Sequence, residues 1–68
     1  MIRNRLSEKR NEGISLEGLA RKIGIEKSYL WKIEKGLRIP RYELMLKLAK
    51  YFNCKVEDLF YLEELEKS

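Results

Sequence analysis

The hydrophobic positions of this 68-residue chain recur at intervals of three and four residues, and no segment alternates apolar and polar residues over six or more positions. Spacings of three and four place side chains on one face of an α-helix, whereas strict alternation is typical of a strand. The pattern therefore predicts an all-α fold. We expect five helices, at about residues 2–12, 16–23, 27–35 and 41–52, with the fifth beginning near Val56 and containing Leu59 and Phe60.

Local signals mark the ends of these helices. Serine favours helix N-caps, glycine favours the position after the last turn, and proline interrupts a helix. The expected boundary residues are Gly13, Ser15, Gly24, Gly36 and Pro40. The connections are then short, and helices of about nine residues cannot pack lengthwise. We therefore expect a compact five-helix bundle that forms one domain over residues 1–68. The expected inward-facing residues of the first, second and fourth helices are Ile2, Leu6, Leu16, Leu19, Ala20, Ile23, Met45, Leu48, Ala49 and Phe52.

The third predicted helix has an unusual outward face. Leu30 and Ile33 fall on one side of it, and the opposite side carries Ser28, Trp31, Lys32 and Lys35, with Lys27 on the flank near its start. An exposed tryptophan among lysines implies a partner surface that is both anionic and partly apolar. The major groove of DNA has these properties, because phosphates line it and thymine methyl groups lie within it. The alternative is that Trp31 packs on a neighbouring helix or in a subunit contact.

The positive charge is concentrated in the middle of the chain. The whole chain carries a net charge of +4. Residues 21–41 hold seven cations and two anions, a balance of +5, whereas residues 42–68 hold four cations and six anions, a balance of −2. Such a focused basic segment is expected of a nucleic-acid-binding protein. A solvated charged face with no partner would show the same charge count.

The composition argues against several classes of site. One cysteine and no histidine leave no disulfide framework, zinc site or histidine-based triad, so we expect no metal, no cofactor and no catalytic residue. Cys54 is expected to be a small buried apolar residue. The longest apolar run is Leu59–Leu62, far shorter than the ~20 residues of a membrane span. We therefore expect a cytoplasmic protein that associates with the nucleoid and not with membranes.

Several motifs resemble one family. Counting from Leu16, apolar or small residues stand at Leu19, Ala20, Ile23, Gly24, Ile25, Leu30 and Ile33. This spacing resembles the helix-turn-helix of the phage repressor and Cro family, also called XRE-type regulators. The segments "NRLSE" and "GIEKSYLWKIEKGLRIPRYELMLKLAKYFNCKVEDLF" extend the resemblance over almost the whole chain. It implies a lambda repressor-like DNA-binding domain, with the helix-turn-helix over about residues 16–35.

The resemblance implies roles for individual residues. Base readout would fall to the recognition helix, at Lys27, Ser28, Trp31 and Lys32. Contact with the DNA backbone would fall to Ser15, Tyr29, Lys35, Arg38, Arg41 and Tyr42. Glu34 would face back and pair with a cation of the first helix, either Arg10 or Lys9. Two positions depart from the family pattern, because Leu16 replaces a glutamine that usually contacts the backbone and Glu26 replaces a serine N-cap.

The leading hypothesis is a sequence-specific regulator of transcription, most simply a small homodimeric repressor on a near-palindromic operator in double-stranded DNA. An activator, a controller protein or an antitoxin would share the fold, and no small-molecule effector is evident.

We expect dimerisation through segment 56–66. Its apolar residues extend past the core, and they are Phe60, Tyr61, Leu62 and Leu65. Residues 61–66 could be helix or strand. The alternative function is a protein-interaction module or antitoxin-type partner, with Trp31 and Tyr29 at a protein interface.

Overall fold

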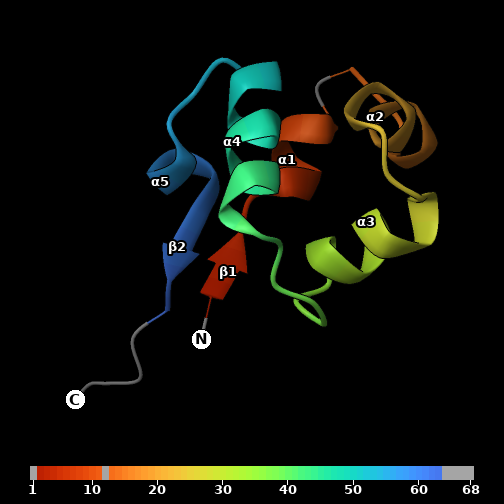
Figure 1. Cartoon of the computed structure of the whole chain (residues 1–68). Helices are drawn as coiled ribbons and strands as arrows, with labels where there is room; N and C mark the ends of the chain where they lie inside the picture. The colour runs from red at the N-terminus through yellow and green to blue at the C-terminus, as the bar shows by residue number, and fades with distance from the viewer. Residues whose placement is uncertain (1, 12, 64–68) are drawn as a thin grey trace.

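The computed structural model describes residues 2–11 and 13–63, and five helices and two short strands form this part of the chain (Figure 1). The helices are α1 (Leu6–Arg10), α2 (Leu16–Ile23), α3 (Lys27–Glu34), α4 (Tyr42–Tyr51) and α5 (Val56–Leu59). The strands are β1 (Ile2–Asn4) and β2 (Phe60–Leu62). The prediction of a helical fold with five helices is confirmed, and α2, α3 and α4 begin and end within one residue of the predicted positions.

The two ends of the described chain form an antiparallel two-stranded sheet, which the sequence did not predict. Ile2 pairs with Leu62 and Asn4 pairs with Phe60. The prediction that the first helix begins at residue 2 is therefore wrong, as is the placement of Phe60 in the fifth helix. The Asn4 side chain accepts a hydrogen bond from the Leu6 amide at 3.1 Å, which satisfies an N-terminal donor of α1 and favours its start after the strand.

The core lies where the helices and the sheet meet. Its buried residues are Leu6, Leu19, Ala20, Leu30, Ile33, Leu48, Ala49, Leu59 and Phe60. Ile2, Leu16, Ile23, Met45 and Phe52 pack around this cluster and are partly buried, as is the free thiol of Cys54. In Figure 1, α2 and α3 lie at the right of the view, and the sheet lies at the lower left.

The helix α2 has the caps that its sequence predicts. The hydroxyl of Ser15 accepts a hydrogen bond from the Gly18 amide at 3.0 Å. This close approach also explains the glycine at position 18, because a Cβ there would lie 3.1 Å from the Ser15 hydroxyl oxygen and 3.1 Å from Cγ1 of Ile14. Gly24 ends the helix in the left-handed conformation, with φ 91°. It thereby makes the turn that leads into α3.

Replacing Gly24 by alanine should destabilise the protein by about 1–2 kcal/mol, because a residue with a Cβ is strained in the left-handed conformation. A Cβ at this position would meet no atom within 4 Å, so the cost comes from the backbone and not from a steric clash. Urea unfolding measures the change. Gly24→Asn is the matched control, since asparagine tolerates this conformation better, and equal losses for the two variants would contradict the explanation.

Candidate nucleic-acid interface

The outward face of α3 presents the residues that the sequence assigned to base readout. Leu30 and Ile33 are buried, at 0% and 1% exposure, and hold the inner side of the helix against the core. Lys27, Ser28 and Lys32 are exposed, and Trp31 is 44% exposed. Trp31 is therefore only half covered within the protomer.

The N-terminus of α2 adds an apolar side chain to this face. Leu16 lines a shallow hollow together with Lys27, Ser28, Trp31 and Lys32 of α3. The Nζ atom of Lys35 lies 5.9 Å from the centroid of the Trp31 ring. This distance is within the range of a cation–π contact. Trp31 therefore lies on an outward surface to which Leu16 adds an apolar side chain and the lysines add positive charge.

A partly buried ion pair anchors the C-terminal end of α3 to α1. The Nε atom of Arg10 donates to Oε2 of Glu34 at 2.8 Å, and a second guanidinium nitrogen donates to Oε1 at 3.1 Å. The side chains are only 19% and 6% exposed, respectively. These hydrogen bonds raise the pKa of Arg10, although burial opposes the shift. Of the two cations that the sequence left open, Arg10 is the one that contacts Glu34 in the structure.

Asn4 provides a second tether that sequence reasoning missed. Its side-chain nitrogen donates to the backbone oxygen of Ile33 at 2.8 Å. This oxygen belongs to the last turn of α3 and also accepts a hydrogen bond from the Gly36 amide at 3.0 Å. Asn4 therefore joins the sheet to α3, and its only sequence signal was an N-cap residue type two positions before Leu6.

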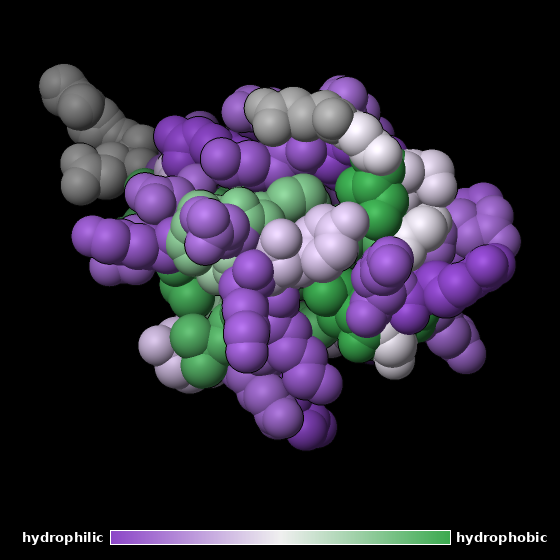
Figure 2. Space-filling model, turned by 90° about the horizontal axis from the view of Figure 1, so that it is seen from above, coloured by the Kyte–Doolittle hydropathy of each residue, from purple (hydrophilic) through white to green (hydrophobic). Residues whose placement is uncertain are grey.

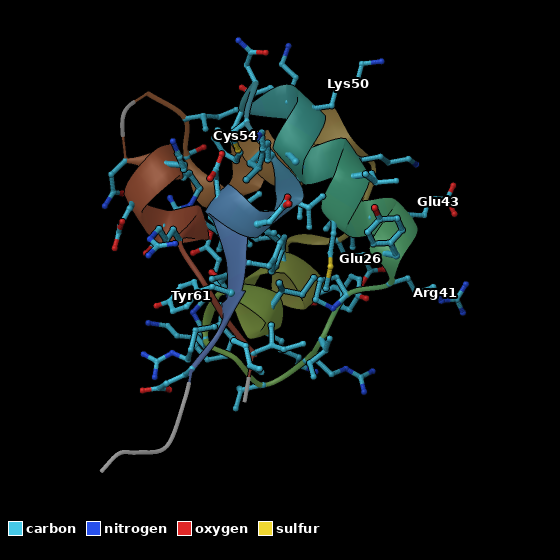
Figure 3. The ribbon with its side chains drawn as sticks, turned by 90° about the vertical axis from the view of Figure 1, so that its left-hand side faces the viewer. Glu26, Arg41, Glu43, Lys50, Cys54 and Tyr61 are labelled. Atoms are coloured by element: carbon cyan, nitrogen blue, oxygen red, sulfur yellow. The ribbon has the colours of Figure 1, made fainter. Side chains whose placement is uncertain are left out.

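The residues assigned to the DNA backbone come from the start of α2, from α3, and from the connection to α4. Ser15 is the N-cap of α2, and Tyr29 lies within α3. Lys35 is the C-cap of α3, Arg38 lies exposed in the connecting loop, Arg41 is the N-cap of α4, and Tyr42, the first residue of α4, is 66% exposed. Figure 3 shows the Arg41 side chain projecting away from the ribbon. Tyr29 is half-buried and lines a second hollow with Arg41.

Two acidic residues lie close to this surface. Glu26 is the N-cap of α3, but its side chain makes no capping hydrogen bond. Glu43 lines the second hollow beside Arg41, and the two side chains project from the same end of α4 in Figure 3. Lys47, which the sequence analysis did not select, lines the same hollow. The electrostatic potential near the start of α4 therefore comes from cations and anions together.

The residues expected at a subunit interface differ in their exposure. Phe60 is only 6% exposed and belongs to the core of the protomer itself, so its assignment to an interface is corrected. Tyr61 is half-buried, with the Arg5 guanidinium 4.2 Å from its ring centroid. Leu62 is 68% exposed. Leu65 lies outside the described residues.

Hydrophilic residues dominate the surface seen from above, where hydrophobic residues form a broken area between them (Figure 2). In the described residues, no group of three or more histidine, cysteine or acidic side chains is arranged to hold a metal ion. No helix in the same part of the chain is long and apolar enough to cross a membrane.

Known proteins are similar in sequence to this chain along most of their length. An uncharacterized HTH-type transcriptional regulator of Archaeoglobus fulgidus is 36% identical over 66 residues, which cover 96% of this chain and 94% of the relative. The HTH-type regulator YgzD of Bacillus subtilis is 39% identical over 64 residues, which cover 93% of this chain and 97% of that protein. A similar regulator of Methanocaldococcus jannaschii is 40% identical over 53 residues, with coverage of 78% and 80%.

A solved structure supports the same fold. The solution structure of the SOS-response transcriptional repressor LexA from Eubacterium rectale superposes with a TM-score of 0.76 at 26% identity, covering 93% of this chain and 68% of that one. The family model described as Helix-turn-helix matches residues 6–59, from the start of α1 to the end of α5. The chain therefore belongs to the XRE-type helix-turn-helix family that its sequence resembles.

Proposed function

We propose that this protein is a sequence-specific regulator of transcription that binds double-stranded DNA and is not an enzyme. The observation that carries the proposal is the outward face of α3, where Lys27, Ser28, Trp31 and Lys32 are all exposed while Leu30 and Ile33 fix the helix from behind. A helix of this kind fits the major groove, where lysine donates to guanine and apolar groups contact thymine. The names of the relatives, which are HTH-type transcriptional regulators, support the same assignment.

The finer proposal is a homodimeric repressor that acts in the cytoplasm, on the nucleoid, at a near-palindromic operator. Two recognition helices of a symmetric dimer would read half-sites about one DNA turn apart, roughly 34 Å. Repression requires little more than occupancy of the operator, so a chain of this size is sufficient for it. Dimerisation would use the C-terminal part of the segment 56–66, at Tyr61, Leu62 and Leu65.

The dimer should be sensitive to charge at Leu62. The side chain is 68% exposed, so Leu62→Glu should leave the melting temperature of the protomer nearly unchanged while it weakens an apolar interface. Sedimentation equilibrium at tens of micromolar should show a dimer for the unmodified chain and a monomer for this variant. Leu37→Glu is the matched control, because Leu37 is 63% exposed in the loop after α3. A monomer for the unmodified chain, or a dimer for both variants, would contradict the proposed interface.

Selection of bound duplexes from a random pool tests the function itself. A palindromic consensus would support both sequence-specific DNA binding and two-fold symmetry, and a pool with no enrichment would contradict the proposal.

The competing function, a protein-interaction module, needs Trp31 and Tyr29 at one interface. In the structure these residues line different hollows, Trp31 with Leu16 and Tyr29 with Arg41. Early elution from a heparin column at moderate salt would favour this alternative.

A further inference from the structure

The hollow between the N-terminus of α2 and the outward face of α3 has apolar walls within a basic surface. Its volume is about 410 Å³, and its lining comes from Leu16, Lys27, Ser28, Trp31 and Lys32. The two lysines contribute their aliphatic stems to the wall, so their ammonium groups stand outside it. The hollow therefore offers no hydrogen-bonding group to a ligand, although cations surround it.

These properties select among the groups that DNA presents in the major groove. All four bases present hydrogen-bonding atoms there, and thymine alone adds a C5-methyl group beside its O4 acceptor. A donor or acceptor that faces the apolar wall would lose its water without gaining a partner, which is unfavourable. A methyl group loses no hydrogen bond and gains contact with Leu16 and the indole of Trp31.

We propose that this hollow selects thymine, through its C5-methyl group, at one position of the sequence read by each recognition helix. Leu16 and Trp31 are then specificity-determining residues at this position, and Lys27 and Lys32 lie at the rim of the hollow. This inference rests on the proposed DNA-binding function. It adds which base the hollow selects and which group of that base it contacts.

The test uses the full chain and its selected duplex, in which each thymine is replaced singly by deoxyuridine. This replacement removes the methyl group and keeps every hydrogen-bonding atom of the base. Fluorescence anisotropy at fixed salt should show about fourfold weaker binding at one thymine in each half of the site, the factor expected for one buried methyl group. At the same position, 5-methylcytosine should bind about fourfold more tightly than cytosine.

Two variants connect this methyl dependence to the hollow. Leu16→Gln replaces an apolar side chain by an amide of similar length, and Trp31→Ala removes the indole. Each folded variant should bind the thymine and deoxyuridine duplexes with equal affinity. Leu46→Gln is the matched control, because Leu46 is 45% exposed on α4 and does not line the hollow. It should keep the fourfold difference. Circular dichroism shows whether each variant folds. If a variant does not fold, the deoxyuridine scan with the unmodified protein still tests whether the thymine methyl group is selected.

The outcomes separate this inference from the function on which it rests. Sequence-specific binding without any deoxyuridine effect would overturn the thymine selection and leave the DNA-binding function intact. A deoxyuridine effect that persists in both Leu16→Gln and Trp31→Ala would show that the methyl group is sensed elsewhere, which also overturns it. Absence of sequence-specific binding by the unmodified chain would overturn both proposals.

Discussion

Replacing Glu34 by alanine should lower the melting temperature by roughly 12–24 °C. The carboxylate is 6% exposed and accepts two hydrogen bonds from Arg10, whose own side chain is 19% exposed. Removing Glu34 from this partly buried pair leaves the Arg10 charge without its partner, at a cost of about 3 kcal/mol. For a domain of this size, each kcal/mol shifts the melting temperature by about 4–8 °C.

The chain provides its own matched control for this prediction. Glu17 and Arg21 form an ion pair on α2 at 3.5 Å, but their side chains are 64% and 81% exposed. Exposed pairs of this kind contribute only about 0.3–0.5 kcal/mol, so Glu17→Ala should shift the melting temperature by no more than about 4 °C. Thermal unfolding followed by circular dichroism compares the two variants. Equal shifts would mean that burial does not strengthen the pair that anchors α3.

The loss of this anchor also bears on function. Glu34 faces α1 and does not lie on the outward face of α3, so we expect it to affect DNA binding only through the position of α3. Asn4 holds the same end of α3 through the Ile33 oxygen. A variant that disturbs either tether should therefore weaken binding without altering which base pairs are preferred.

The helices that form the site could be predicted because their signals are local. Ser15 and Gly24 lie next to the residues that they cap, and the spacing of Leu30 and Ile33 determines which side of α3 is buried. These features depend on neighbours within one or two turns. The outward orientation of Trp31 follows from the same spacing, and its 44% exposure agrees with it.

The sheet could not be predicted in this way. Each strand has three residues, which is too short for an alternating pattern to be recognised, and the pairing of Ile2 with Leu62 joins opposite ends of the described chain. Periodicity gives no information about such distant partners. The same limit applies to the choice between Lys9 and Arg10 as the partner of Glu34, and to the hollow that Leu16 forms with α3. Each depends on how separate elements approach one another.

Base readout and backbone contact should separate on mutation. Lys32 stands on the outward face of α3, with donors suited to guanine O6 and N7. Lys32→Ala should weaken binding to the preferred duplex by about 1–3 kcal/mol and relax the choice at one base pair. Arg41 precedes α4 and its side chain projects from the ribbon (Figure 3), so we expect it to contact a phosphate and not a base. Arg41→Ala should weaken all duplexes about equally and reduce the magnitude of the log–log salt slope by about one.

Position on the surface, and not the loss of a charge alone, should determine these effects. Lys50 lies at the other end of α4 from Arg41, as Figure 3 shows, and a ten-residue helix spans about 15 Å. Lys50→Ala removes the same charge and should leave both the preferred sequence and the salt slope nearly unchanged, whereas Arg41→Lys should keep the slope of the unmodified chain. Titrations of preferred and scrambled duplexes at several salt concentrations distinguish the variants. If Arg41→Ala changed the preferred sequence while Lys32→Ala left it intact, α3 would not be the element in the groove, and the half-exposed Trp31 would require a different partner.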